Sequence, residues 1–150
     1  MIRRFFLADD DQDETDLFGE ALRDIDQSLE LYSAANGKEA ISALYRGQVR
    51  PEIIFLDINM PEMNGWDCLT TLKSDATLRE IPVVMYSTSS AGLDGKRAVQ
   101  SGAICYLEKP PSFLKLKDFL EKISISSRTN LPATLRAIEA NKSHRLVISD

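Results

Sequence analysis

The stretch IIFLD at residues 53–57 decides the fold, because it is a continuous apolar run that ends in a carboxylate. Such a run is typical of a strand that is buried on both faces of a sheet. Comparable runs occur at residues 5–8 (FFLA), 83–86 (VVMY) and 104–107 (ICYL), and we interpret residues 29–33 (LELYS) as a further strand. The chain therefore contains five predicted strands.

Helical patterns separate and follow these strands. Apolar residues recur at helical spacing within residues 17–25, 40–45, 66–72, 93–101 and 113–123. Strands that are apolar on both faces and alternate with helices indicate a parallel sheet with helices on each side. We therefore predict an α/β fold, with a doubly wound five-stranded parallel sheet flanked by five helices.

Length and composition limit the class of protein. The 150 residues fit one ordinary domain, and 43% apolar with 27% charged residues is a globular composition. The net charge of −5 argues against broad nucleic-acid binding, which needs a basic surface. No run approaches the ~18 apolar residues of a membrane span, and the acidic run from Asp9 cuts the first apolar stretch too short for a signal peptide. We expect a cytoplasmic protein that binds neither nucleic acid nor a membrane.

The last residues of the sequence differ from the alternating series. We predict one domain over residues 1–125, followed by a C-terminal tail over residues 126–150 that is too short for a second domain. Within the tail, Leu131, Leu135 and Ile138 recur at helical spacing, which predicts a short helix. The tail matches no output domain, and its apolar stripe raises the hypothesis of a weak homodimer.

Polar side chains follow four of the predicted strands, at the point where each strand ends. They are Asp9, Asp10 and Asp11 after the first strand, Asp57 and Asn59 after the third, Ser87 after the fourth and Lys109 after the fifth. Because parallel strands end at the same edge of a sheet, where ligands bind in open α/β folds, we expect these groups to lie close together.

This set of side chains is suited to metal-dependent phosphoryl chemistry. Clustered carboxylates repel one another unless a cation joins them, and Mg²⁺ prefers such hard oxygen ligands. A carboxylate can act as a nucleophile and hold an aspartyl phosphate, while a lysine and a hydroxyl stabilise the phosphoryl oxygens. Taken singly, each residue has a more ordinary explanation, such as a solvated loop or a helix cap. The argument for a site is their combination.

The segments that carry these residues resemble the receiver domain of bacterial two-component response regulators. The matching segments are residues 6–11 (FLADDD), 54–61 (IFLDINMP), 64–65 (NG), 81–87 (IPVVMYS) and 106–110 (YLEKP). The resemblance covers about residues 2–124, and it implies a flavodoxin-like sheet with strand order 2-1-3-4-5.

The resemblance implies a role for each acidic residue. Asp57 matches the phosphoacceptor, and Asp9 and Asp10 match the acidic pair that binds Mg²⁺ together with Asp57. Asn59 matches the residue that lends its backbone carbonyl to the metal. Asp11 departs from the pattern, because it extends the acidic pair to a triple.

The resemblance also implies a switch. Ser87 and Lys109 match the residues that contact the phosphoryl group, and Ser87 with Tyr106 match the switch pair. As the serine moves toward the phosphoryl group, the tyrosine turns inward and alters the face formed by the fourth helix, fifth strand and fifth helix. The Lys109–Pro110 peptide bond is a position where the family commonly has the cis form.

These matches predict a single-domain response regulator. A histidine kinase or a phosphotransfer protein would supply the phosphoryl group, and a downstream protein would recognise the altered face. The domain would assist its own phosphotransfer and dephosphorylation without being an enzyme for other substrates.

Two alternatives come from other classes of protein. The first is an aspartate-nucleophile phosphohydrolase of the haloacid dehalogenase type, which would turn over a phosphate ester. The second is a receiver-like scaffold that binds partners without being phosphorylated, which would show no Mg²⁺-dependent labelling.

Overall fold

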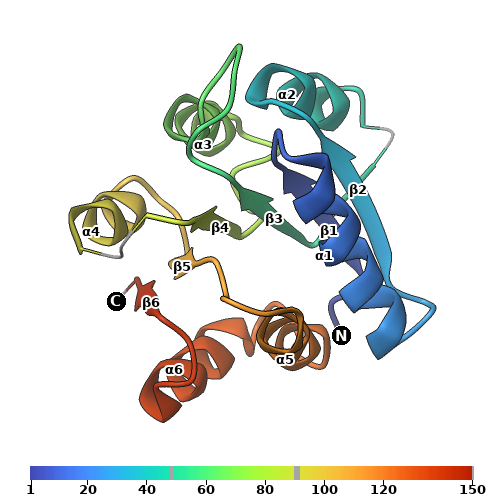
Figure 1. Cartoon of the computed structure of the whole chain (residues 1–150). Helices are drawn as coiled ribbons and strands as arrows, with labels where there is room; N and C mark the ends of the chain where they lie inside the picture. Colours follow the sequence, from blue (N-terminus) through green and yellow to red (C-terminus); the bar gives the residue numbers. More distant parts are fainter. Residues whose placement is uncertain (48, 90–91, 150) are drawn as a thin grey trace.

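The computed structural model describes residues 1–47, 49–89 and 92–149. Within them, strands and helices alternate almost throughout (Figure 1). The elements are β1 (Arg4–Ala8), α1 (Gln12–Ile25), β2 (Glu30–Ala34), α2 (Gly37–Tyr45), β3 (Ile53–Leu56), α3 (Gly65–Ser74), β4 (Val83–Ser87), α4 (Gly92–Gln100), β5 (Cys105–Glu108), α5 (Phe113–Ser124), α6 (Leu131–Asn141) and β6 (Leu146–Ile148).

The strands form one sheet in the order β2-β1-β3-β4-β5-β6. The first five are parallel, so the predicted order 2-1-3-4-5 is confirmed. The prediction of five strands was incomplete, because β6 adds a sixth strand antiparallel to β5, with Leu146 opposite Leu107. Three residues at the end of a chain are too short a run to show a strand period. Their pairing covers what would otherwise be an open edge of the sheet at β5.

The burial of β3 on both faces of the sheet explains why its sequence is apolar at every position. Ile53 and Phe55 face one core, which also contains Phe18 of α1 and Phe119 of α5. Ile54 and Leu56 face a second core, formed with α2, α3 and α4. Alternate side chains of a strand point to opposite faces of the sheet, so both sets are buried. Figure 1 shows α2, α3 and α4 on one side of the sheet and α1, α5 and α6 on the other.

The C-terminal segment, residues 126–149, is part of this arrangement. The predicted short helix is α6, and its apolar stripe of Leu131, Leu135 and Ile138 is buried in the same core as α1 and α5. The stripe that suggested a weak homodimer therefore packs inside its own chain, and the homodimer itself stays a prediction. Among the helices of the described residues, none is long and apolar enough to cross a membrane.

Candidate functional site

Two acidic residues lie side by side because two neighbouring strands end side by side. Ala8 at the end of β1 is opposite Leu56 at the end of β3, and the Asp57 amide donates to the Ala8 carbonyl at 2.9 Å. This register places Asp9 next to Asp57. Carboxylate oxygens of Asp9, Asp10 and Asp57 all lie within 4.8 Å of one another. The structure therefore brings together the three carboxylates that the sequence singled out.

The third residue of the acidic run has a structural task. The Asp11 carboxylate accepts hydrogen bonds from the amides of Asp13 at 2.9 Å and Glu14 at 3.3 Å, which caps the start of α1. The Asp11 amide in turn donates to the Asp9 carboxylate at 2.9 Å. The triple is thus divided, with Asp11 serving the helix while Asp9 and Asp10 contribute oxygens to the acidic cluster.

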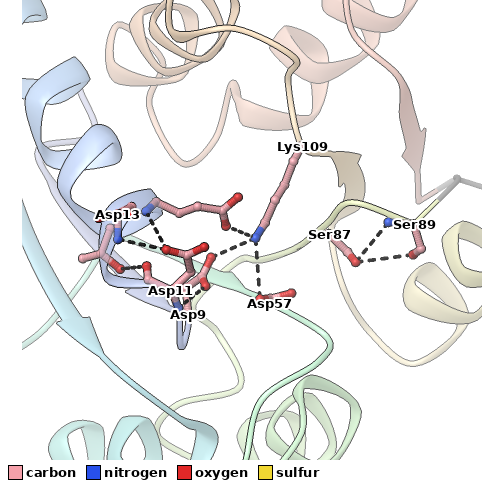
Figure 2. Close-up of polar contacts among 9 residues, drawn as sticks. Asp9, Asp11, Asp13, Asp57, Ser87, Ser89 and Lys109 are labelled. Atoms are coloured by element: carbon pink, nitrogen blue, oxygen red, sulfur yellow. Dashed lines mark hydrogen bonds and ion pairs between the residues drawn. The ribbon is translucent and has the colours of Figure 1, made fainter.

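The ammonium group of Lys109 faces the carboxylates of Asp9 and Asp57 (Figure 2). The Nζ atom of Lys109 lies 2.9 Å from Oδ2 of Asp9 and 3.5 Å from Oδ2 of Asp57, and it also contacts the carboxylate of Glu14. The Lys109 amide donates to the carbonyl of Ser87 at 2.7 Å, which fixes the start of the β5–α5 loop. The side chain of Lys109 is only 9% exposed, so its charge is held inside the pocket.

The electrostatics of this pocket favour a further cation. Burial raises the pKa of Asp57 to about 6; Lys109 opposes the rise, while the carboxylate of Asp9 adds to it. Burial alone would lower the pKa of Lys109, but hydrogen bonds to Glu14 and Asp9 raise it above its ordinary value. Asp9, Asp57 and Glu14 thus share one ammonium group, and Asp10 adds a further carboxylate beside Asp9 and Asp57. Hard carboxylate oxygens are the ligands that Mg²⁺ prefers, and clustered carboxylates are stabilised by a cation, so the residues fit that ion.

Asn59 is exposed in the turn that follows β3. Its backbone amide lowers the pKa of Asp57, against the larger effect of burial. The turn therefore approaches the acidic cluster, and a role for the Asn59 carbonyl as a metal ligand stays a prediction.

The predicted switch residues form a separate hydrogen-bonded cluster around Ser89. Ser87 ends β4, is buried and has its hydroxyl 3.3 Å from the hydroxyl of Ser89. Tyr106 is fully buried, donates its hydroxyl to the Ser89 carbonyl at 2.6 Å and lies 2.7 Å from the Ser89 hydroxyl. The Ser89 hydroxyl donates to Asp94 of α4 at 2.9 Å. Ser89 thus connects the end of β4 with β5 and α4.

Two expectations concern Tyr106 and the Lys109–Pro110 peptide bond. Tyr106 points inward in this structure, because Ser89 holds its hydroxyl, and its role as a switch residue stays a prediction. The cis form expected at Lys109–Pro110 is wrong, because every peptide bond of the described residues is trans. In Figure 2, Ser87 and Ser89 lie apart from Lys109 and its carboxylate partners, which include Asp57.

Two contributors were missed at the sequence level. Glu14 reaches Lys109 only because α1 starts directly after the Asp11 cap, which turns the first helical residues over the pocket. The cap itself is visible in the sequence, so it was the available signal. Asp94 becomes relevant only through the packing of α4 near Ser89, for which the sequence has no local signal.

Comparison with known proteins agrees with this geometry. The model of the response regulator receiver domain matches residues 5–121 of the chain. The chain belongs to the response regulator receiver family. Chemotaxis protein CheY1 of Helicobacter pylori is 32% identical to this receiver over 94 residues, which cover 63% of this chain and 75% of that protein.

Solved structures show the same similarity. The phosphorylated cyanobacterial phytochrome response regulator RcpA matches this receiver with a TM-score of 0.74 and 31% identity, over 82% of this chain and 91% of RcpA. The Mn²⁺-bound form of response regulator Rcp1 matches with a TM-score of 0.69 and 29% identity, over 81% and 91% of the two chains. The receiver spans only 28–50% of the length of three other curated relatives.

Proposed function

We propose that this receiver accepts a phosphoryl group on Asp57 in a Mg²⁺-dependent reaction. The observation that carries the proposal is the convergence of the Asp9, Asp10 and Asp57 carboxylates within 4.8 Å, with the Lys109 ammonium 3.5 Å from Asp57. Two further findings support it: the chain belongs to the receiver family, and the similar structures of RcpA and Rcp1 are described as phosphorylated and Mn²⁺-bound.

The proposed chemistry assigns a task to each side chain. Asp9, Asp10 and Asp57, with the backbone carbonyl of Asn59, would hold Mg²⁺, which when bound supplies positive charge against the phosphoryl oxygens. An Asp57 carboxylate oxygen attacks phosphorus, the bond from phosphorus to the donor nitrogen breaks, and the donor imidazole leaves with the electron pair. Lys109 neutralises charge on a phosphoryl oxygen.

The Ser87 hydroxyl contributes by changing its partner. It now interacts with Ser89 at 3.3 Å, which is a weak contact, and a phosphoryl dianion is a stronger acceptor. We propose that Ser87 moves to the phosphoryl group and that Ser89 passes the change to Tyr106 and Asp94. In this proposal Ser89 transmits the change, since Tyr106 is already buried and hydrogen-bonded to it.

The proposed partners follow from this chemistry. A phosphohistidine on a histidine kinase or a phosphotransfer protein supplies the phosphoryl group in the cytoplasm, and a downstream protein reads the altered surface. The face predicted for that reading, formed by α4, β5 and α5, now includes β6, which pairs with β5. We therefore propose that residues 1–125 carry the chemistry and that the C-terminal segment contributes to the surface for the downstream protein.

Acetyl phosphate with Mg²⁺ tests this function. We expect the chain to gain the mass of one phosphoryl group, and expect Asp57→Asn and removal of Mg²⁺ with EDTA each to abolish the gain. Asp16→Asn is the matched control, because Asp16 is an exposed residue of α1 whose carboxylate bonds only locally, to Gln12. An Asp57→Asn variant that gains the same mass would refute the assignment.

The same experiment separates the two alternatives. Continuous release of product from a phosphate ester, with turnover far above the amount of protein, would favour a phosphohydrolase. A wild-type chain that never gains mass with acetyl phosphate and Mg²⁺ would favour a receiver-like scaffold.

A further inference from the structure

Lys109 has one carboxylate neighbour that lies outside the proposed metal site. Its ammonium contacts Asp9, Asp57 and Glu14, and of these only Glu14 is absent from the set of proposed Mg²⁺ ligands. Lys109 donates hydrogen bonds to Glu14 and Asp9, whereas Asp57 lies 3.5 Å from the ammonium nitrogen as an ion-pair partner. Glu14 therefore competes with the reactive aspartate for the one ammonium group that the phosphoryl chemistry needs.

The position of Glu14 is determined by the start of α1. Its backbone amide is held by the Asp11 cap at 3.3 Å, so the side chain leaves the first turn of the helix toward Lys109. It is 33% exposed, whereas Lys109 is 9% exposed. Glu14 borders a groove of about 140 Å³ between α1 and the β5–α5 loop, where Leu17 and Phe113 are among the lining residues. Glu14 is thus at the entrance of the pocket, between the buried lysine and solvent.

We propose that Glu14 is a positioning residue that holds Lys109 away from Asp57 until a phosphoryl group arrives. This inference rests on the proposed function of Asp57. A single carboxylate at the pocket entrance outweighs Asp57 while Asp57 carries at most one negative charge. A phosphoryl group on Asp57 brings a charge of about −2, which draws the lysine away from Glu14. Glu14 thereby slows phosphorylation and makes the lysine contact depend on the phosphoryl group.

Three variants of one helix test the proposal. Glu14→Gln removes the charge and keeps the shape, Glu14→Asp keeps the charge but shortens the reach, and Asp16→Asn removes a charge from the same helix without touching Lys109. With acetyl phosphate and Mg²⁺, we expect the phosphorylation rate constant to rise about 3- to 10-fold in Glu14→Gln, because a close competing ion pair is lost. The rate constant of Glu14→Asp should lie between those of Glu14→Gln and wild type. The rate constant of Asp16→Asn should equal that of wild type.

A second measurement does not depend on phosphorylation. The side-chain nitrogen signal of Lys109 in NMR spectra of the metal-free protein should shift in Glu14→Gln and stay unchanged in Asp16→Asn, because Glu14 contacts the ammonium group and the carboxylate of Asp16 instead accepts from Gln12. Unfolding midpoints in urea show whether each variant is folded. If Glu14→Gln is unfolded, Glu14→Asp replaces it in the comparison with wild type.

The outcomes distinguish the two proposals. If wild type gains a phosphoryl group and Glu14→Gln reacts at the same rate as Asp16→Asn, the role of Glu14 is overturned while the function of Asp57 stands. If wild type gains none, the function of Asp57 fails, and the lysine signal still decides whether Glu14 holds Lys109. An unshifted lysine signal in Glu14→Gln overturns the positioning role in either case.

Discussion

The acidic pocket and the C-terminal segment both bury side chains near β5, and they have opposite effects on stability. The pocket buries the charged Asp9 and Asp57 with one shared ammonium group, which is an arrangement that opposes folding at neutral pH. The C-terminal segment buries Leu131 and Leu135 completely, which favours folding. The chain thus keeps a reactive site that is electrostatically unfavourable, and a segment outside the family match adds stability through its own packing.

The largest expected effect comes from the C-terminal segment. Leu135→Ala should lower the free energy of unfolding by about 2–5 kcal/mol, because it leaves a cavity in the core that α6 shares with α1 and α5. Urea denaturation measures the change. Arg136→Ala, on the exposed side of the same helix, is the control and should change the value by less than about 0.5 kcal/mol. Equal effects of the two changes would show that the segment does not belong to the core.

A pair of glycines in α4 tests how closely this helix packs on β6. A Cβ atom at Gly95 would lie 2.5 Å from Cγ2 of Val147, so Gly95→Ala should destabilise the protein by about 1–3 kcal/mol through overpacking. A Cβ atom at Gly92 would meet nothing within 4 Å, so Gly92→Ala should be neutral or stabilising by up to about 1 kcal/mol. Thermal unfolding of both variants measures the difference, and the reverse order would contradict the contact between α4 and β6.

In the acidic pocket, removing the charge of Asp57 should raise the stability of the protein rather than lower it. The pKa of Asp57 is raised from 3.8 to about 6, so the folded state favours the protonated form. This contribution to stability is fully present below the ordinary pKa and is lost as the pH rises through about 6. In EDTA, Asp57→Asn should therefore be more stable than wild type by about 1–2 kcal/mol at about pH 8.

The advantage of Asp57→Asn should disappear as the pH falls to about 4, where the wild-type carboxyl is protonated for most of the time in the folded protein. Urea denaturation at both pH values measures it. A variant that is less stable than wild type at the higher pH would mean that Asp57 is a stabilising partner of Lys109, and the contrast between the two regions would then be lost.

The smallest expected effect concerns the hydrogen-bonded cluster around Ser89. Tyr106→Phe removes the hydroxyl that donates to the Ser89 carbonyl at 2.6 Å, and should cost about 1 kcal/mol of stability. Tyr45→Phe, at an exposed position of α2, should have no measurable effect in the same urea titration. If the two changes are equivalent, the Ser89 cluster does not hold β5 in place.

The ends of the strands explain why much of the site was predictable. A buried strand such as β3 is apolar at every position, so the first polar residue after it marks the edge of the sheet. Asp9, Asp57, Ser87 and Lys109 all lie at such ends, and the parallel order of the strands brings Asp9, Asp57 and Lys109 together. Residues on helices were not predictable in the same way. Glu14 and Asp94 face the site only because of where α1 begins and how α4 packs.

The sequence by itself determined the alternation of strands and helices, the parallel sheet and the edge at which the acidic residues meet, because hydrophobic period and strand ends are local properties. The tertiary structure alone decided the place of the C-terminal segment. A stripe such as Leu131, Leu135 and Ile138 is apolar whether it covers a partner or its own core, and only the open edge of β5 and the nearby core show that it folds back. It also decided how Lys109 is shared, since three carboxylates from separate parts of the chain compete for one ammonium group at distances that no local pattern encodes.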